Sequence, residues 1–513
     1  MERMRKFLKF LSQRIVIVTF LIFLQIMWFV GMFLKVTSYS QYITAAFKIL
    51  SILVVIYIMN RSDNPSVKLG WIVVILLFPL FGGLLYLTIG GKQPISYLRR
   101  KLEPMIEESV RHLKADPEIE QELKEKDGST ASQIYYLEHQ SGFPAYKDSK
   151  VDYYPSGEDC FKVMAEELRK AKEYIYLEYF IIEEGIMWNT ILDILEEKVK
   201  EGVDVRVMYD DVGCIFNLPS HYADFLRKKG IKCIVFNRYI PIFSTVFNNR
   251  DHRKILVIDG DVAFTGGINF ADEYINEKMR FGHWKDTGFM LRGEAVAGFT
   301  AMFLEMWNVN DEHIEDCGEY IQASKKYSVS TDGFVIPFGD TPLDEVYVGK
   351  RAYINNLNNA SEYTYIMTPY LVIDDEMYEC MKYAAQRGVD VKIIMPHIPD
   401  KKYAFYLART YYKELLKAGI EIYEYTPGFV HAKMSISDGK KAIVGTVNHD
   451  YRSLYLHYEC AAYMLNVPAV MDIERDFKDT LELSQKITLE DVKHFNIFTK
   501  LLGHIIRLVA PLL

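Results

Sequence analysis

The sequence has few cysteines and no excess of basic residues, and these two shortages exclude several classes of protein. Its six cysteines are scattered without C-x-x-C spacing, so neither a disulfide framework nor a zinc site is indicated. The net charge is −8 at pH 7, whereas nucleic-acid-binding proteins usually carry a basic footprint. Half of the 513 residues are apolar and a quarter are charged. This composition is typical of a globular chain with several domains and excludes disorder.

Charged residues are also scarce in the first 90 positions, where three apolar runs occur. Residues 15–34 form a run without a charge, of about the 20 residues that a bilayer core requires. Residues 42–59 contain one lysine, and residues 69–89 contain a proline followed by a pair of glycines, Gly82 and Gly83. The first run is longer than the apolar part of a signal peptide, and no cleavage site follows it. We therefore predict a membrane anchor over residues 1–91, with two to three apolar helices.

Basic residues flank all three runs, so the positive-inside rule fixes neither the number of full spans nor the membrane face that carries the rest of the chain. Residues 92–150 are charged and mixed, and here we expect a solvated connector with a short amphipathic helix. The last segment, residues 491–513, predicts a basic amphipathic helix that lies at the membrane interface or packs on the rest of the protein.

The region between these segments contains the same pattern twice. Strand-like and helix-like stretches alternate, which predicts an α/β fold. The segment "GVDVRVMYD" at 202–210 matches "GVDVKIIMP" at 388–396, and other landmarks recur at a nearly constant offset. We therefore predict a domain duplication, with one module over residues 151–330 and a second over residues 331–490.

An octet with the spacing H-x-K-x-x-x-x-D occurs once in each module. The first, "HRKILVID", begins at His252, and the second, "HAKMSISD", begins at His431. The alternation or β-branching of the apolar residues places both octets on strands. Side chains two apart on a strand point to the same face. His252 and Lys254 therefore share a face, as do His431 and Lys433.

Each octet ends in an aspartate, and a glycine follows it directly. This pair is typical of a hairpin turn. The chain then returns through a segment that ends in G-x-x-N, which brings Asn269 and Asn448 back toward the His/Lys face. The aspartates, Asp259 and Asp438, belong to the motif and are counted with the catalytic set. Their position far along the strand from the histidines nevertheless indicates a structural role.

Each module thus offers an imidazole, an ammonium group and a carboxamide near one point. Imidazole acts as a nucleophile or as an acid and base near neutral pH, while lysine and asparagine stabilise the charge of a phosphate. A nucleophilic histidine needs a second group to protonate the leaving alkoxide, and two modules supply both. Lysine is a poor metal ligand and no H-x-x-x-H set accompanies the octets, so neither a metal nor another cofactor is predicted.

A carboxylate follows each octet at the head of a strand-like run. These are Asp286 in "HWKDTGFML" and Glu459 in "LHYECAAYM". A carboxylate beside a catalytic imidazole fixes its tautomer and favours its charged form. A solvent-facing acid at a strand end is the alternative. Arg452, in "NHDYRS", is a candidate for holding phosphate, with a structural ion pair as the alternative.

Taken together, these motifs resemble the phospholipase D superfamily and, within it, the bacterial cardiolipin synthases. The resemblance covers nearly all of the chain, including the apolar front "GWIVVILLFPLFGGLLYLTIGGK" and the segments "YLEYFIIEEG", "FTGGINFADEY" and "TPYLVIDDEM". It implies N-terminal transmembrane helices followed by two phospholipase D-like α/β modules with a shared active site at their interface. It also implies a multi-pass protein of the bacterial cell membrane.

The resemblance further implies a two-step exchange through a phosphohistidine, without a metal. One histidine attacks phosphatidylglycerol and glycerol leaves, and a hydroxyl of a second phosphatidylglycerol then attacks to give cardiolipin. By analogy His252 is the nucleophile and His431 the general acid and then base, although the reverse assignment stays open. The acids are implied to act crosswise, with Glu459 on His252 and Asp286 on His431.

The sequence departs from the family pattern at a few positions, and other functions remain to be weighed. Gly267 stands where many members have serine, the second motif has Thr446, and His457 stands where relatives often have asparagine. A hydrolytic phospholipase D, or a phosphatidyltransferase that uses another alcohol, differs only in the acceptor. The acidic balance and the anchor count against a nuclease, and the two complete octets count against a scaffold with a degenerate enzyme fold. We expect phosphatidylglycerol and membrane lipids as partners and no nucleic acid, while the oligomeric state stays open.

Overall fold

The computed structural model divides into two compact units, Met1–Leu98 with Tyr239–Asn248 and His504–Leu513, and Arg99–Arg238 with Asn249–Gly503. Besides four isolated positions between residues 23 and 31, the residues that it describes are 40–61, 64–78, 82–83, 85–86, 95–113, 115–126, 128–238, 249–311, 314–324, 329–344 and 346–512.

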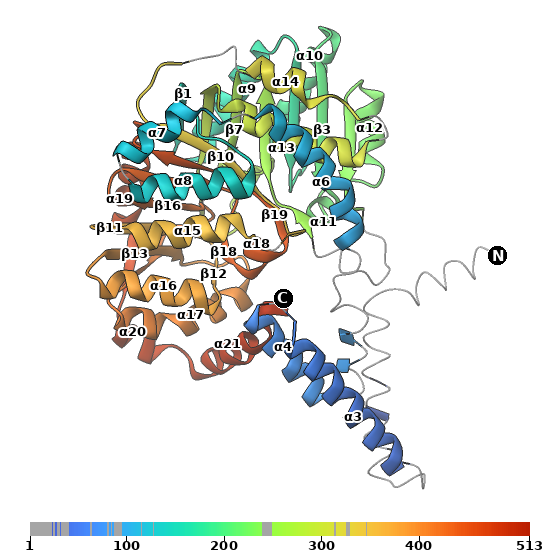
Figure 1. Ribbon diagram of the computed structural model, residues 1–513, viewed down its shortest axis with the longest axis vertical. Coiled ribbons are helices and arrows are strands. Elements are labelled where there is room, and N and C mark those ends of the chain that lie inside the picture. Colours follow the sequence, from blue (N-terminus) through green and yellow to red (C-terminus); the bar gives the residue numbers. More distant parts are fainter. Residues whose placement is uncertain are drawn as a thin grey trace, which may run out of the picture. The chain divides into compact units, whose positions relative to one another are not determined.

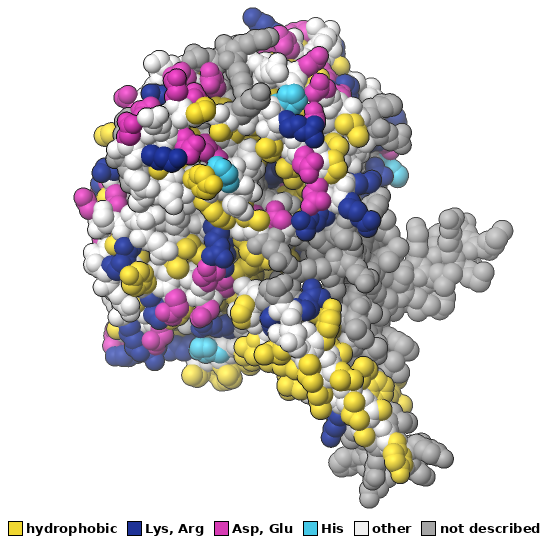
Figure 2. Space-filling view, in the orientation of Figure 1, with side chains coloured by type: hydrophobic (Ala, Val, Ile, Leu, Met, Phe, Trp, Pro, Cys, Tyr) yellow, Lys and Arg dark blue, Asp and Glu magenta, His cyan; other side chains and the backbone are white. Residues whose placement is uncertain are grey.

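The first unit contains two apolar helices, α3 (Ser40–Met59) and α4 (Pro65–Leu77). Asn64 caps α4 by accepting a hydrogen bond of 2.8 Å from the N–H of Ser66. The two helices share a small core of buried side chains, and most of their other large apolar side chains are exposed. Figure 2 shows these hydrophobic side chains gathered over α3 and α4. The buried core residues are Val54, Ile58, Ile75 and Tyr86.

The three apolar runs fall differently on the described residues. The second run, 42–59, lies within α3, and the third, 69–89, begins in α4. The first run, 15–34, lies almost entirely outside the described residues. Within the part of the chain that the structure describes, no helix combines the length and the apolarity needed to cross a membrane. The expected two to three spans of residues 1–91 therefore stay a prediction.

The second unit is built around two large sheets, one from each predicted module. The strands of the first sheet are β1 (Ser149–Tyr154), β2 (Tyr174–Tyr179), β3 (Asp204–Asp210), β4 (Lys232–Phe236), β6 (Lys254–Ile258), β7 (Val262–Gly266) and β9 (Gly288–Gly293). The strands of the second are β5 (Arg250–Asp251), β10 (Phe334–Asp340), β11 (Tyr363–Met367), β13 (Asp390–Pro396), β14 (Glu421–Tyr425), β16 (Met434–Ser437), β17 (Lys441–Gly445), β19 (His457–Leu465) and β20 (Ser484–Ile487).

The two sheets share one order over seven strands, and the second has a further edge strand, β20. The order is β1-β9-β7-β6-β2-β3-β4 in the first and β10-β19-β17-β16-β11-β13-β14-β20 in the second, with β5 paired to β19. In each sheet the octet strand, β6 or β16, runs antiparallel to its neighbour β2 or β11, which in turn runs parallel to β3 or β13. This shared order confirms the predicted α/β fold with duplicated domains.

Helices cover the sheets, so the central strands are apolar on both faces. In Figure 1, α13 lies against the first sheet, and it is buried along almost its whole length because it also contacts β10 of the second. The helices of the first module are α9 (Gly157–Lys170), α10 (Ile186–Lys200), α11 (Asp211–Cys214), α12 (Tyr222–Lys228), η2 (Asp272–Ile275), α13 (Val296–Asn310) and α14 (Cys317–Ser324). Those of the second are α15 (Val348–Asn359), α16 (Asp375–Gln386), α17 (Lys402–Lys417), α18 (Tyr451–Tyr455) and α19 (Ala469–Glu482).

Four short strands form two small sheets, in which β8 (His283–Lys285) pairs with β15 (Gly428–Val430) and β12 (Leu371–Val372) pairs with β18 (His449–Asp450). The chain ends in α20 (Leu489–His494), α21 (Ile497–Val509) and η3 (Ala510–Leu512). On α21, the side chains of Phe498, Leu501 and Leu508 are exposed. The expected single amphipathic helix over residues 491–513 is thus interrupted between α20 and α21.

The segment expected as a solvated connector is more ordered than predicted. It forms α6 (Ile95–His112), α7 (Pro117–Lys126) and α8 (Gly128–Ser141). Ile134 and Leu137 of α8 are buried, because α8 packs against α15 and β10 of the second module. Their spacing of three residues is that of one helix face, which the surrounding charged residues concealed in the sequence.

The aspartates that end the two octets have a structural role. Both adopt a left-handed φ, 51° for Asp259 and 53° for Asp438, at the hairpin turn. The carboxylate of Asp259 accepts three backbone N–H bonds of 2.8 Å at the start of β2, and that of Asp438 accepts three of 2.8–3.0 Å at the start of β11. These bonds to the backbone at the far end of the strand support the structural role expected for both residues, while their place in the catalytic set stays a prediction.

Replacing Asp438 with alanine should lower the free energy of unfolding by about 2 kcal/mol, since hydrogen bonds to a charged group contribute about that much. Burial alone would raise the pKa of Asp438, but the N–H donors of Tyr363, Ser361 and Glu362 outweigh it and lower the pKa. The stabilisation is therefore complete above the ordinary aspartate pKa and is lost as the pH falls through the lowered value.

Urea unfolding of Asp438→Ala at neutral pH and at about pH 3, near the ordinary aspartate pKa, measures both the loss and its pH dependence. Asp193→Ala, at an exposed position of α10, is the matched control and should cost little at either pH. A loss for Asp438→Ala that is the same at both pH values would contradict the role of the charge.

Candidate active site

Each octet histidine is positioned by a short strand that pairs with the other module. The strand β5 directly precedes His252 and pairs with β19, while β15 directly precedes His431 and pairs with β8. The N–H of His252 donates to the carbonyl of Tyr458 at 3.0 Å, and the N–H of His431 donates to that of Lys285 at 2.7 Å. Both histidines therefore lie just outside β6 and β16, between the modules, rather than on the strands as predicted.

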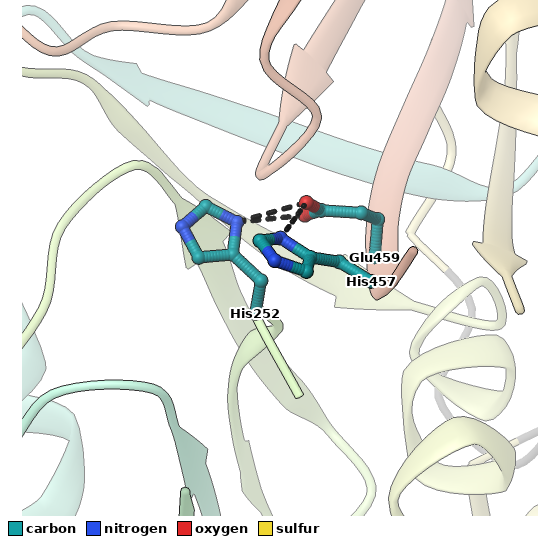
Figure 3. Close-up of side chains that lie close together, drawn as sticks. All are labelled: His252, His457 and Glu459. Carbon is teal, nitrogen blue, oxygen red and sulfur yellow. Dashed lines mark hydrogen bonds and ion pairs between the residues drawn. The ribbon is translucent and has the colours of Figure 1, made fainter. Parts of the chain in front are cut away.

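The carboxylates predicted to orient the histidines lie on, or directly after, the strands with which β5 and β15 pair. Glu459 is on β19, and both of its carboxylate oxygens lie 2.9 Å from Nδ1 of His252, as Figure 3 shows. Asp286 directly follows β8, and its Oδ2 lies 2.6 Å from Nδ1 of His431. All four side chains are buried. The contacts are crosswise, since each histidine meets the acid of the other module.

The octet lysines are buried beside the histidines. Nζ of Lys254 donates to the carbonyl of His252 at 2.6 Å, and Nζ of Lys433 donates to the carbonyl of His431. Burial lowers the pKa of Lys254 to about 8 and that of Lys433 to about 7, although nearby carboxylates oppose the shift. A bound anion would favour the charged form of both lysines, so they are suited to hold a phosphate.

Burial also lowers the pKa of both histidines. The pKa of His252 falls well below its usual value through burial, with further lowering by Lys254, Lys433 and His431. The pKa of His431 falls to about 4, because burial and Lys433 outweigh the contact with Asp286. Burial therefore favours the neutral form of both imidazoles. Because Nδ1 carries the proton that binds the carboxylate, Nε2 keeps a lone pair for attack or for accepting a proton.

The two asparagines predicted to bind phosphate have different surroundings. Oδ1 of Asn269 accepts a bond of 3.0 Å from the N–H of Ile181, and Nδ2 donates to the Tyr274 hydroxyl at 2.7 Å. Asn269 thus has two structural contacts. Oδ1 of Asn448 is buried and has no hydrogen-bond partner among the residues that the structure describes. Asn448 therefore has more capacity left for a ligand than Asn269 has.

The departure at Gly267 has a steric reason. A Cβ at this position would lie 2.0 Å from Oδ1 of Asp286, so only glycine leaves room for that carboxylate. The equivalent residue of the second module is Thr446, whose hydroxyl instead donates to Glu459. The first module thus combines the shorter acid, Asp286, with a glycine, and the second module combines the longer acid, Glu459, with a threonine.

The sequence patterns did not identify the aromatic side chains around the histidines. The rings of Trp284 and Tyr274 lie 5.3 and 5.4 Å, between centroids, from that of His431. The ring of Phe180 lies 5.0 Å from that of His252. Trp284 lies two residues before Asp286, which was a predicted site residue. This closeness in the sequence is the one signal that could have identified Trp284.

His457 and Arg452 also belong to this site. Together with His252 and Glu459, His457 forms a group whose ligand atoms lie within 4.8 Å of one another, a spacing that a metal ion accepts. Nε of Arg452, a residue expected to hold phosphate or to form an ion pair, donates to Nε2 of His457 at 3.3 Å. Burial lowers the pKa of His457 to about 3.

Replacing Gly267 with alanine should push the Asp286 carboxylate away from His431. Overpacking of this kind costs about 1–3 kcal/mol, and the pKa of His431 should fall below its value of about 4 because Asp286 is a group that raises it. Thermal unfolding measures the first effect, and the pH dependence of His431 modification by diethyl pyrocarbonate measures the second. Thr446→Ser, which keeps the hydroxyl on Glu459, is the matched control. Unchanged reactivity of His431 in Gly267→Ala would show that the carboxylate does not need this space.

Comparison with known proteins places the chain in a family. The model described as "Cardiolipin synthase, PLD-like domain" matches residues 164–307 and 353–481, and that described as "Phospholipase_D-nuclease N-terminal" matches residues 49–91. The chain is 50% identical over 463 residues to an uncharacterized protein of Streptococcus mutans, covering 90% of this chain and 99% of that protein. It is 33% identical over 462 residues to the cardiolipin synthase of Alkalihalophilus pseudofirmus, covering 90% and 91%.

A solved structure shows the same fold. The crystal structure of phosphatidylserine synthase from Haemophilus influenzae aligns with a TM-score of 0.56 at 13% identity, covering 74% of this chain and all of that one. The family models and relatives confirm the resemblance predicted from the sequence and the predicted class of enzyme, a phosphatidyltransferase of the phospholipase D type. The chain belongs to the phospholipase D-like cardiolipin synthase family.

Proposed function

We propose that this protein is a cardiolipin synthase that transfers a phosphatidyl group from one phosphatidylglycerol to another and releases glycerol. The observation that carries the proposal is the pair of buried histidines, each bonded through Nδ1 to a carboxylate of the other module. Two histidines in one site provide both a nucleophile and a proton carrier. Membership of the family supports the choice of lipid substrates.

In the first step, Nε2 of His252 attacks the phosphorus of phosphatidylglycerol. A P–N bond forms and the P–O bond to glycerol breaks. His431, which takes up a proton at Nε2 when the anionic lipid binds, gives that proton to the leaving oxygen. Lys254 and Lys433 balance the negative charge on the phosphoryl oxygens. The product of this step is a phosphatidyl-histidine on the enzyme and free glycerol.

In the second step, a glycerol hydroxyl of another phosphatidylglycerol attacks the same phosphorus. His431, now neutral, takes the hydroxyl proton, a P–O bond forms and the P–N bond to His252 breaks. The product is cardiolipin, and the enzyme returns to its starting protonation state. Hydrolysis, the alternative, differs only in that water replaces the second lipid.

The surroundings of the histidines favour this assignment of roles. The Nδ1 contact of His431 with Asp286 is 2.6 Å, whereas that of His252 with each oxygen of Glu459 is 2.9 Å. Asp286 raises the pKa of His431 against burial, while the lysines and His431 lower that of His252 further. His431 therefore accepts a proton more readily, as a general acid and base must, and His252 stays neutral, as a nucleophile must.

We further propose that residues 1–91 anchor the enzyme in the bacterial cell membrane as a multi-pass segment of two to three helices. The N-terminal family model at residues 49–91 and the exposed apolar side chains of α3 and α4 support membrane association. Residues 92–150 then connect to modules over 151–330 and 331–490, and residues 491–513 end the chain. Phosphatidylglycerol and other membrane lipids are the expected partners, and the reaction above uses no metal.

Purified protein in detergent micelles with labelled phosphatidylglycerol and a chelator should form cardiolipin and an equal amount of glycerol. Thin-layer chromatography of the lipid and an enzymatic assay of glycerol measure both. Phosphatidic acid as the main product would replace the proposal with the hydrolytic alternative. Formation of a different phosphatidyl ester upon addition of another alcohol, with no cardiolipin, would assign that alcohol as the acceptor.

His252→Ala should abolish covalent labelling of the enzyme by lipid labelled in the phosphatidyl group, since no other nucleophile replaces it. His431→Ala should still form the labelled enzyme, but turnover should fall by about a thousandfold or more, because the proton carrier is missing. Acid-quenched protein, analysed by mass spectrometry without acid hydrolysis, locates the label. Labelling that survives in His252→Ala and disappears in His431→Ala would reverse the two roles.

A further inference from the structure

The two halves of the site differ in the side chain that stands two residues before each acid. Two residues before each acid stands a ring that faces the histidine of the other module, namely Trp284 before Asp286 and His457 before Glu459. The ring centroids of Trp284 and His431 lie 5.3 Å apart, and those of His457 and His252 also lie 5.3 Å apart. The same place is therefore taken by an indole in one half and by a titratable imidazole in the other.

A contact with Arg452 fixes the tautomer of His457. Nε of Arg452 lies 3.3 Å from Nε2 of His457, and a guanidinium can only donate. Nε2 therefore carries a lone pair, and the single proton of the neutral ring sits on Nδ1. Nδ1 lies 3.5 Å from Oε1 of Glu459 and has no closer hydrogen-bond partner among the described residues. In Figure 3 the rings of His457 and His252 both lie beside the Glu459 carboxylate.

We propose that His457 is a positioning residue that, held by Arg452, directs its Nδ1 hydrogen at Glu459 and keeps that carboxylate turned toward His252. Glu459 then receives three donors, since the Thr446 hydroxyl and Nδ1 of His252 also bond to it. Asp286 has two, the N–H of Thr287 at 2.8 Å and Nδ1 of His431. The contact of 3.5 Å is long, as catalytic contacts commonly are in the absence of substrate.

The consequence is a chemical difference between the two histidines, and it rests on the proposed function. Additional donors withdraw charge from Glu459, so this acid stabilises a protonated His252 less than Asp286 stabilises a protonated His431. His457 thereby keeps His252 in its neutral, nucleophilic form, and the indole of Trp284 gives no such donor to Asp286. The duplicated halves take different roles because of this one side chain.

The same three residues have the spacing of a metal site, but the tautomer favours the positioning role. A metal ion at this site would need the lone pair of Nδ1 on His457, whereas the contact with Arg452 leaves a proton on that atom. Lys254 and Lys433 both lower the pKa of His252, which places their charges close enough to repel a cation. Inhibition by a metal is therefore a distinguishing outcome of the test.

The test compares His457→Phe, which keeps a ring and removes the donor, with His457→Asn, whose amide nitrogen takes roughly the place of Nδ1. In His457→Phe the kcat for cardiolipin formation should fall by about tenfold, the low end for loss of a group that orients a site residue. The KM for phosphatidylglycerol should stay the same, and the acid limb of the pH–rate profile should move to higher pH because His252 becomes easier to protonate. His457→Asn should restore the wild-type profile and most of the rate.

A second measurement does not depend on lipid. The pH dependence of His252 acylation by diethyl pyrocarbonate, followed by mass spectrometry, reports the neutral fraction of that ring. The midpoint of this pH dependence should rise in His457→Phe. It should also rise in Arg452→Gln, because Arg452 then no longer fixes the tautomer of His457. It should stay unchanged in His457→Asn. His494→Phe, at an exposed position of α20, controls for the loss of a histidine. If the wild type makes no cardiolipin but the variants show these shifts relative to it, the proposed function is rejected and the positioning role is retained.

Two results would overturn the role of His457. The first is an acylation midpoint and a pH–rate profile in His457→Phe that equal those of the wild type. The second is inhibition of the wild type by micromolar Zn²⁺ that His457→Phe and His457→Asn both abolish, which would assign the three residues to a metal site instead.

Discussion

The active site depends on a reciprocal exchange of short strands between the two modules. The strand before His252 pairs with β19 of the second module, and the strand before His431 pairs with β8 of the first. Because Glu459 lies on β19 and Asp286 directly follows β8, the backbone bonds that place each histidine also place its acid. Neither module alone can assemble a histidine–carboxylate pair, so the catalytic unit is the pair of modules.

Burial determines what this constellation can do. In water the histidines and lysines would be charged to a degree set by their ordinary pKa values, but in the closed site burial lowers the pKa of all four. Two imidazoles and two lysines whose charged forms an anion would favour are suited to a phosphodiester. The buried carboxylates keep the imidazole Nδ1 atoms occupied, so the reactive Nε2 atoms remain available.

The duplication supplies two equivalent frameworks, and small side-chain differences distinguish the surroundings of their histidines. Glycine at 267 leaves room for the short carboxylate of Asp286 against the backbone, whereas Thr446 donates a hydroxyl to the longer Glu459. An indole stands beside one histidine and an imidazole beside the other. The strand order is unaffected by these differences, because they involve side chains at the ends of strands and not the apolar residues that hold the sheets.

The amino-acid sequence by itself determined the duplication, the α/β class, the two octets and the family, because each of these is a pattern within a short stretch or a repeat of one. It also pointed to the structural role of Asp259 and Asp438 through their distance along the strand. Only the tertiary structure placed the histidines outside their strands, packed α8 into the second module and brought Trp284 beside His431. Local periodicity reports which face of an element is apolar, but not which distant segment covers it. The pairing of His252 with Glu459 joins residues 207 positions apart. The resemblance implied this pairing, but the two-residue strand β5 that creates it is too short to leave a pattern in the sequence.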